Sequence, residues 1–156
     1  MTGHLLVVWH PLPPSIARLR DAALAGIADA AGVRPVSSLA APDAGIDDVE
    51  AADACILITP ENFGAVSGLM KDFLERIYPW FEDVPNRRPG LPYLLVAKGG
   101  SDGTGAVRDV TRILVGLRWR EVLPPVVIAG AVDDLHLAQV RERAATLAIG
   151  VDTGVF

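Results

Sequence analysis

The chain of 156 residues contains a single cysteine, Cys55, so no disulfide can form within it. Small secreted domains commonly depend on disulfides, and the shortage of cysteine therefore favours a reducing, cytoplasmic location. Cys55 stands in an apolar run, where a cysteine usually serves as a small buried hydrophobic residue. The first residues show no basic segment followed by an apolar core and a cleavage site, and no apolar run reaches the length of a membrane span. The sequence therefore predicts no membrane partner.

Positive charge is also scarce, since 14 Lys and Arg face 19 Asp and Glu and the net charge is −5. Surfaces that bind nucleic acid gather Lys and Arg on one face, so we expect no nucleic-acid partner. The histidines at positions 4, 10 and 136 lack the spacing of metal-binding motifs, and no metal site is predicted. GxGxxG and the Gly-Lys-Ser/Thr ending of a P-loop are both missing, which argues against those nucleotide-binding classes.

What the sequence does contain is the composition of a compact globular protein. Hydrophobic residues make up 51% and charged residues 21% of the chain. A chain of this length buries about two thirds of the surface that it exposes when unfolded, which is enough for a stable core. We therefore predict one domain spanning residues 1–156.

Five short apolar runs alternate with segments of helical spacing. The runs cover residues 4–9, 33–38, 54–59, 93–97 and 126–129. Helical spacing covers residues 16–30, 67–77, 106–117 and 133–149, while 45–50 reads as a short connector or a single helical turn. Apolar strands alternating with helices indicate an α/β fold, in which helices cover both faces of a parallel sheet. Right-handed crossovers favour the strand order 2-1-3-4-5.

Residues 78–92 interrupt this alternation with four prolines, and we predict a loop that crosses the rim of the site. The aromatic residues Tyr78, Trp80 and Phe81 begin this segment. They either pack the core and rim, or form a pocket wall or a subunit contact. Arg87 and Arg88 are either a solvated basic pair or partners for a nucleotide phosphate.

The stretch 57–76, LITPENFGAVSGLMKDFLER, is the most informative of the chain, because an apolar run stops at Thr-Pro and a small-residue loop leads into an amphipathic helix. Ligands of α/β proteins collect at such carboxyl ends of parallel strands. The stretch resembles the flavin-contacting loop of flavodoxin-like proteins, specifically the branch of NAD(P)H-dependent FMN oxidoreductases and multimeric flavodoxins. The residues that match its pattern are Thr59, Pro60, Phe63, Gly64, Ser67, Gly68 and Lys71.

The resemblance extends over nearly the full length, and it implies a three-layer flavodoxin-like sandwich with a five-stranded parallel sheet. It also implies FMN as cofactor, with the loop at 10–15 on the phosphate and the loops at 60–66 and 98–104 beside the isoalloxazine ring. The implied cofactor-binding residues are His10, Ser15, Ile16, Ala17, Thr59, Pro60, Glu61, Asn62, Phe63, Gly64, Lys98, Gly99, Gly100 and Gly103. Glycines near position 100 independently favour a flat ligand, because backbone amides approach closely where no Cβ intervenes.

Three side chains of these loops have further expected roles. Pro60 is expected to fix the turn, and Phe63 either stacks on the ring or packs against its own helix. Glu61, if it faces flavin N5, would disfavour an anionic reduced flavin. Thr104 or Ser101 is expected to cap the helix that follows the glycine turn.

The first loop departs from the resemblance, because it reads His10-Pro11-Leu12-Pro13-Pro14-Ser15 where relatives offer Ser, Thr and Gly. Proline has no N–H, so three positions cannot donate to a phosphate. At about 1 kcal/mol or somewhat more for each missing hydrogen bond, affinity falls by roughly two to three decades. The amides of Ser15, Ile16 and Ala17, and the positive charge of His10 or Arg18, are the available compensation.

The resemblance implies an FMN-binding oxidoreductase that passes reducing equivalents from NADH or NADPH to a small acceptor such as a quinone or a flavin. The chemistry belongs to the flavin, so no catalytic side chain is predicted. A homodimer or homotetramer is implied as well. The alternative is a flavin-free flavodoxin-like binding or structural module, for which the proline-filled phosphate loop is the main argument.

Overall fold

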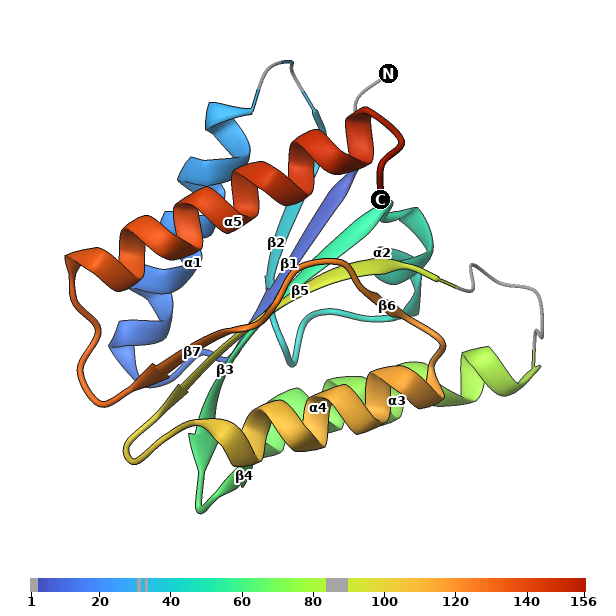
Figure 1. Cartoon of the computed structure of the whole chain (residues 1–156). Helices are drawn as coiled ribbons and strands as arrows, with labels where there is room; N and C mark the ends of the chain where they lie inside the picture. The colour runs from blue at the N-terminus through green and yellow to red at the C-terminus, as the bar shows by residue number, and fades with distance from the viewer. Residues whose placement is uncertain (1–2, 31, 33, 84–89) are drawn as a thin grey trace.

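The computed structural model describes residues 3–30, 32, 34–83 and 90–156, and a central sheet with helices on both faces organises them (Figure 1). The helices are α1 (Pro14–Asp29), α2 (Ile46–Ala51), α3 (Gly68–Asp83), α4 (Thr104–Gly116) and α5 (Asp134–Asp152). Helices α1 and α5 cover one face of the sheet, and α2, α3 and α4 cover the other. The segment at 45–50 is thus a short helix. None of the described helices is long and apolar enough to cross a lipid bilayer.

The sheet has the predicted parallel strand order, except that two short strands share the last place, beside β5. Its strands are β1 (Leu5–Trp9), β2 (Val36–Ala40), β3 (Ala54–Asn62), β4 (Ala65–Val66), β5 (Pro92–Gly99), β6 (Arg120–Glu121) and β7 (Val126–Ala129). The order is β2-β1-β3-β5, after which both β6 and β7 pair with β5 in parallel, while β4 pairs with β3 in the antiparallel sense. The sheet therefore has seven strands rather than the five expected. The edge is divided at Pro124 and Pro125, which have no N–H for the ladder.

Two apolar cores result from the alternation of side chains along the buried strands. Leu5 and Val7 of β1 face α1 and α5, whereas Leu6 and Val8 face the side of α3 and α4. All four side chains are fully buried. Burial on both faces explains why the strands read as continuous apolar runs instead of alternating ones.

The segment at residues 78–92 corrects one expectation. Helix α3 continues to Asp83, and β5 begins at Pro92. The Gly90 N–H donates to the Arg118 carbonyl (2.6 Å), close to where β5 and β6 start. Residues 78–83 are helical and Gly90 and Leu91 lead into the amino end of β5, so at these positions the expectation of a loop crossing the rim of the site is wrong. Residues 84–89, which include Arg87 and Arg88, and the side chains of Trp80 and Phe81 lie outside the described residues.

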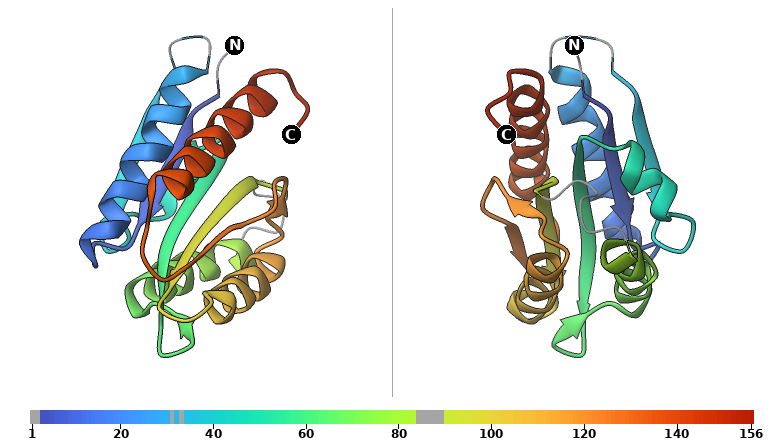
Figure 2. Two further views of the ribbon diagram at one scale, coloured as in Figure 1. Left: turned by 60° about the vertical axis from the view of Figure 1, so that its left-hand side comes forward. Right: turned by 90° about the vertical axis from the view of Figure 1, so that its right-hand side faces the viewer.

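Helices α1 and α5 pack closely enough to exclude a side chain between them. A Cβ at Gly26 of α1 would lie 2.0 Å from the Arg141 carbonyl oxygen of α5, so only glycine fits at this position. Figure 2 shows the two helices side by side on the same face. The backbones therefore approach each other directly.

At the amino edge of the sheet, an ion pair between Arg34 and Asp152 joins three segments that are distant in the sequence. Arg34 Nη1 donates to Asp152 Oδ1 (2.9 Å), and the Gly3 N–H donates to the same oxygen (3.0 Å). The Arg34 side chain is 2% exposed and that of Asp152 is 17% exposed. The hydrogen bonds from Arg34 hold the pKa of Asp152 below its ordinary value.

Candidate functional site

The connections that follow β1, β3 and β5 meet at the carboxyl edge of the sheet, as predicted. The His10 N–H at the end of β1 donates to the Ile58 carbonyl of β3 (3.0 Å). On the other side, the Gly130 N–H after β7 donates to the Gly99 carbonyl (2.8 Å). The structure thus places the loops at 10–15, 60–66 and 98–104 in one row.

The loop at 60–66 is a β-hairpin that projects beyond the rest of the sheet (Figure 2). Strand β3 runs on through Pro60, which pairs with Lys98, and ends at Asn62, which pairs with Ala65. The turn consists of Phe63 and Gly64, with φ angles of +54° and +73°, as in type I′ hairpin turns. Pro60 therefore lies within the strand, and the expectation that it fixes the turn is wrong.

Phe63 stands alone at the tip of this hairpin. Its relative exposure is 108%, so it does not pack against its own helix. A bulky residue with positive φ is uncommon and costs of the order of 1 kcal/mol or more of backbone strain. Strained residues of this kind cluster at ligand sites, and an apolar ring held in solvent is available to cover a flat ligand.

Thr59 and Ser67 fasten the hairpin to α3. Both side chains are fully buried, and their hydroxyl oxygens lie 2.8 Å apart. The Thr59 hydroxyl also approaches the Pro60 carbonyl, at 2.9 Å. The Thr59 side chain is therefore engaged in the protein and faces away from the open edge.

Glu61 joins the hairpin to the start of α4. Its Oε2 accepts hydrogen bonds from the N–H groups of Gly105 (2.7 Å) and Ala106 (3.2 Å). The N-cap residue of α4 is Gly103, which has no side chain of its own to cap these amides. The carboxylate is thus held by a helix N-terminus, which favours negative charge. The Glu61 side chain therefore points to the start of α4.

The hairpin and the glycine turn touch through backbone atoms as well. A Cβ on Gly105 would lie 1.9 Å from the Gly64 carbonyl oxygen. A Cβ on Gly99 would lie 2.4 Å from the Gly103 nitrogen and 3.0 Å from Glu61 Oε1. Close approach therefore requires glycine at both positions, while Gly100 has open space where its Cβ would be.

The cap inside the glycine turn comes from Asp102. Its Oδ1 accepts from the N–H (2.9 Å) and the hydroxyl (2.8 Å) of Thr104. The backbone hydrogen bond from Thr104 is the main cause of the lowered pKa of Asp102. The expectation of capping by Thr104 or Ser101 is wrong, because Asp102 and Glu61 accept these hydrogen bonds. The Asp-Gly-Thr spacing, typical of an Asx turn, was the local signal for Asp102.

The first loop is closed on itself. His10 is 8% exposed, and its Nδ1 lies 2.7 Å from the Leu12 carbonyl oxygen and 3.1 Å from the Leu12 nitrogen, donating to the first or accepting from the second according to the tautomer. The Ile16 N–H donates to the Pro13 carbonyl (2.9 Å). Ser15 and Ala17 remain half-buried at the start of α1. Of the predicted amide donors, Ile16 is therefore already used by the protein.

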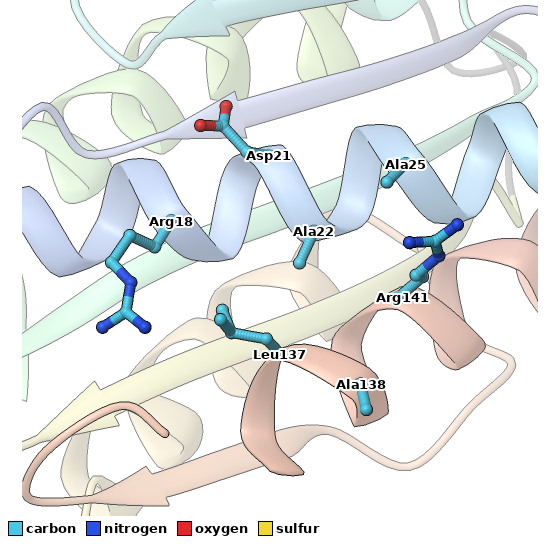
Figure 3. A pocket seen from close by; sticks show the side chains of 7 residues that line it. All are labelled: Arg18, Asp21, Ala22, Ala25, Leu137, Ala138 and Arg141. Carbon is cyan, nitrogen blue, oxygen red and sulfur yellow. The ribbon is translucent and has the colours of Figure 1, made fainter. Parts of the chain in front are cut away.

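Arg18, the other candidate for compensating charge, is directed toward α5. Its Nη1 donates to the Val132 carbonyl (3.2 Å) in the connection between β7 and α5. It lines a groove of about 500 Å³ between α1 and α5. Figure 3 shows the Arg18 side chain near Leu137, with Arg141 at the other end of the groove.

The site fits the two parts of FMN unequally. The hairpin and the glycine turn are in contact, with the Phe63 ring exposed and open space at Gly100, and they suit a planar ring. The loop at 10–15 offers few donors and does not suit a phosphate. Within the described residues, no group of three or more His, Cys, Asp or Glu side chains is placed to hold a metal ion.

Solved structures share this fold at low sequence identity. The chain is similar to a WrbA-like flavodoxin from Agrobacterium tumefaciens, with a TM-score of 0.75, 17% identity, and coverage of 97% of this chain and 99% of that chain. It is also similar to a flavodoxin from the domain Archaea, with a TM-score of 0.79 and 14% identity, over 96% of this chain and 99% of that chain. The similarity to an NADH:FMN oxidoreductase in its apo form has a TM-score of 0.72 and 19% identity, over 96% of this chain and 89% of that chain. The fold is thus the flavodoxin-like α/β sandwich.

The sequence itself matches a family model, although no curated protein matches it significantly. The model is that of the NADPH-dependent FMN reductases, and the match covers residues 15–134. It begins directly after the proline-rich loop and includes both the hairpin and the glycine turn. Because it spans most of the chain, this protein belongs to the NADPH-dependent FMN reductase family.

Proposed function

We propose that this protein binds the isoalloxazine ring of a flavin at the carboxyl edge of its sheet, and passes reducing equivalents from NADH or NADPH to a small acceptor such as a quinone or a second flavin. The observation that carries the proposal is the contact between the β3–β4 hairpin and the start of α4, where Glu61 accepts from Gly105 at 2.7 Å. This contact fixes the relative position of the two loops beside which a planar ring would lie.

The residues of the chain position the ring, and the flavin supplies hydride and electron transfer. Gly100 offers backbone at a point where its missing Cβ leaves open space. Phe63, fully exposed on the hairpin tip, offers an aromatic face. Glu61 holds the β3–β4 hairpin against the start of α4. The edge is open to solvent at Phe63 and Gly100, which favours small, flat acceptors.

Titration of the purified protein with FMN, followed by flavin fluorescence and visible absorbance, tests the proposal. Saturable binding and anaerobic reduction of the bound flavin by NADH or NADPH are expected. In the Gly100→Phe variant the new Cβ meets no protein atom within 4 Å, and the ring that it carries should abolish binding. Gly116→Phe, at the far end of α4 where a Cβ also meets nothing, is the matched control.

A colourless protein at high micromolar FMN would contradict this proposal and favour the flavin-free module. Equal loss of binding in both variants would mean that the effect of Gly100→Phe is not local.

The proposal includes a cytoplasmic homodimer or homotetramer. The single thiol, Cys55, is fully buried, and burial raises its pKa, so it suits a reducing compartment without taking part in chemistry. Leu69 of α3 and Val115 of α4 are 38% and 69% exposed and supply apolar surface for self-association. Light scattering on a sizing column measures the mass, and a monomer at micromolar concentration would contradict this part.

A further inference from the structure

We infer that this protein recognises a flavin by its ring and not by its phosphate, so that FMN and riboflavin bind with nearly equal affinity. The inference rests on the proposed function and deepens it, because it specifies which part of the ligand is read. It follows from an account of every donor in the loop that flavodoxin-like relatives use for the phosphate.

The backbone amides of this loop are missing or already used. Pro11, Pro13 and Pro14 have no N–H. The N–H of His10 donates to the Ile58 carbonyl (3.0 Å), and that of Ile16 to the Pro13 carbonyl (2.9 Å). The Leu12 N–H is directed at Nδ1 of His10 (3.1 Å), a ring nitrogen that also lies 2.7 Å from the Leu12 carbonyl and accepts or donates according to the tautomer. Between residues 10 and 16, the Ser15 N–H is the one amide with no such contact within the described part of the chain.

The N-terminus of α1 is consequently a poor anion site. Helix N-termini bind phosphate through free amides aided by the helix dipole. The N-cap residue here is Pro13, without a side-chain cap, and Pro14 fills the first helical position. The Pro13 carbonyl accepts from Ile16 and not from Ala17. The donors that remain are the amides of Ser15 and Ala17 and the Ser15 hydroxyl.

Cationic side chains near the loop are directed elsewhere. Arg18 donates to the Val132 carbonyl and lies in the groove against α5 (Figure 3). Arg20 stacks on the Trp9 ring, with its guanidinium carbon 4.4 Å from the ring centroid, and pairs with Asp21 at 2.9 Å. Neither side chain is positioned by its contacts to face a phosphate in front of Ser15.

In contrast to the loop at 10–15, the part of the site proposed to hold the ring is well formed. Glu61, Gly99 and Gly105 bring the hairpin and the glycine turn together within hydrogen-bond distance, and Phe63 extends from the tip. Binding free energy should therefore come from the ring, which FMN and riboflavin share.

Fluorescence titrations of the full chain with FMN and with riboflavin, at low and at 0.15 M salt, measure the selectivity. We expect dissociation constants within about threefold of each other, and an FMN affinity that changes little with salt. FMN binding more than threefold tighter than riboflavin would overturn the inference and leave the proposed function standing. Absence of binding for both flavins would instead refute the proposed function and the inference with it.

The Pro14→Ala variant restores one amide at the start of α1 and tests the cause. A charge-assisted hydrogen bond should tighten FMN binding by about tenfold and leave riboflavin unchanged. The control is Pro124→Ala, an exposed proline in the connection before β7, which should alter neither constant. Equal tightening for both flavins, or no gain for FMN, would contradict the assignment to missing amides.

Discussion

Replacing Glu61 with alanine should destabilise the protein although Glu61 is only half-buried, because its carboxylate is the side-chain cap of α4. A lost cap costs about 0.5–2 kcal/mol, and hydrogen bonds to a charged acceptor lie at the upper end of the usual range. We expect a loss of about 2 kcal/mol, which corresponds to a melting temperature lower by roughly 4–8 °C for a chain of this size. Glu61→Gln keeps an acceptor oxygen and should lose about half as much.

Urea denaturation monitored by circular dichroism measures these differences, and Glu75→Ala provides the matched control. Glu75 lies on the exposed face of α3 and pairs with Lys71 one turn away, an interaction worth about 0.3–0.5 kcal/mol. In titrations with FMN, Glu61→Ala should also weaken binding, because the two loops lose their register, while Glu75→Ala should not. If both variants unfold at the same urea concentration within error, Glu61 is not the brace between the hairpin and α4.

Three further outcomes can be measured in the same way. Gly105→Ala should cost more than 2 kcal/mol of unfolding free energy, because its Cβ would lie 1.9 Å from a carbonyl oxygen, whereas Gly116→Ala in the same helix should gain up to about 1 kcal/mol; equal effects would refute the close approach. Phe63→Ala should leave stability within about 0.5 kcal/mol, since the ring is fully exposed, and weaken flavin binding about three- to tenfold; unchanged binding would remove the ring contact. Asp152→Asn should lower the free energy of unfolding at pH 7 by about 3 kcal/mol, because it removes the charged acceptor of two hydrogen bonds from the buried Arg34 side chain. The pKa of Asp152 is lower in the folded than in the unfolded chain, so this stabilisation is present above about pH 4 and disappears as pH falls. Urea midpoints against pH should therefore converge for the two proteins in acid, and parallel curves would refute the ion-pair account.

The sheet and its order could be predicted from sequence because β1, β3 and β5 are buried on both faces, and these strands and β7 read as apolar runs. The last run, 126–129, coincides with its strand. The run expected at 33–38 instead begins at Val36, since β2 lies at the edge, is half-exposed along most of its length and has a weaker pattern. All four residues of β7 are apolar although two are exposed, whereas β2 contains two serines, so the difference lies in the sequence pattern.

The details of the site were harder to predict because they depend on contacts between distant residues. Glu61 caps a helix 44 residues further along, which no local motif announces. The hairpin was missed because proline normally ends a strand and phenylalanine rarely takes a positive φ. The effect of the proline-rich loop was foreseeable in part, since missing N–H groups can be read from sequence, but the use of the Leu12 and Ile16 amides within the protein cannot.

The backbone contact between α1 and α5 limits how the first loop can respond to a ligand. At Gly26 the backbones of the two helices are in contact, and nearer the start of α1 the Arg18 side chain donates a hydrogen bond to the connection into α5. The segment leading into α1 is also anchored where His10 meets β3. Because the loop at 10–15 is held at both ends, its peptide planes have little freedom to rotate toward a ligand. The loop is therefore a rigid, preorganised part of the site, and it discriminates between ligands by their shape.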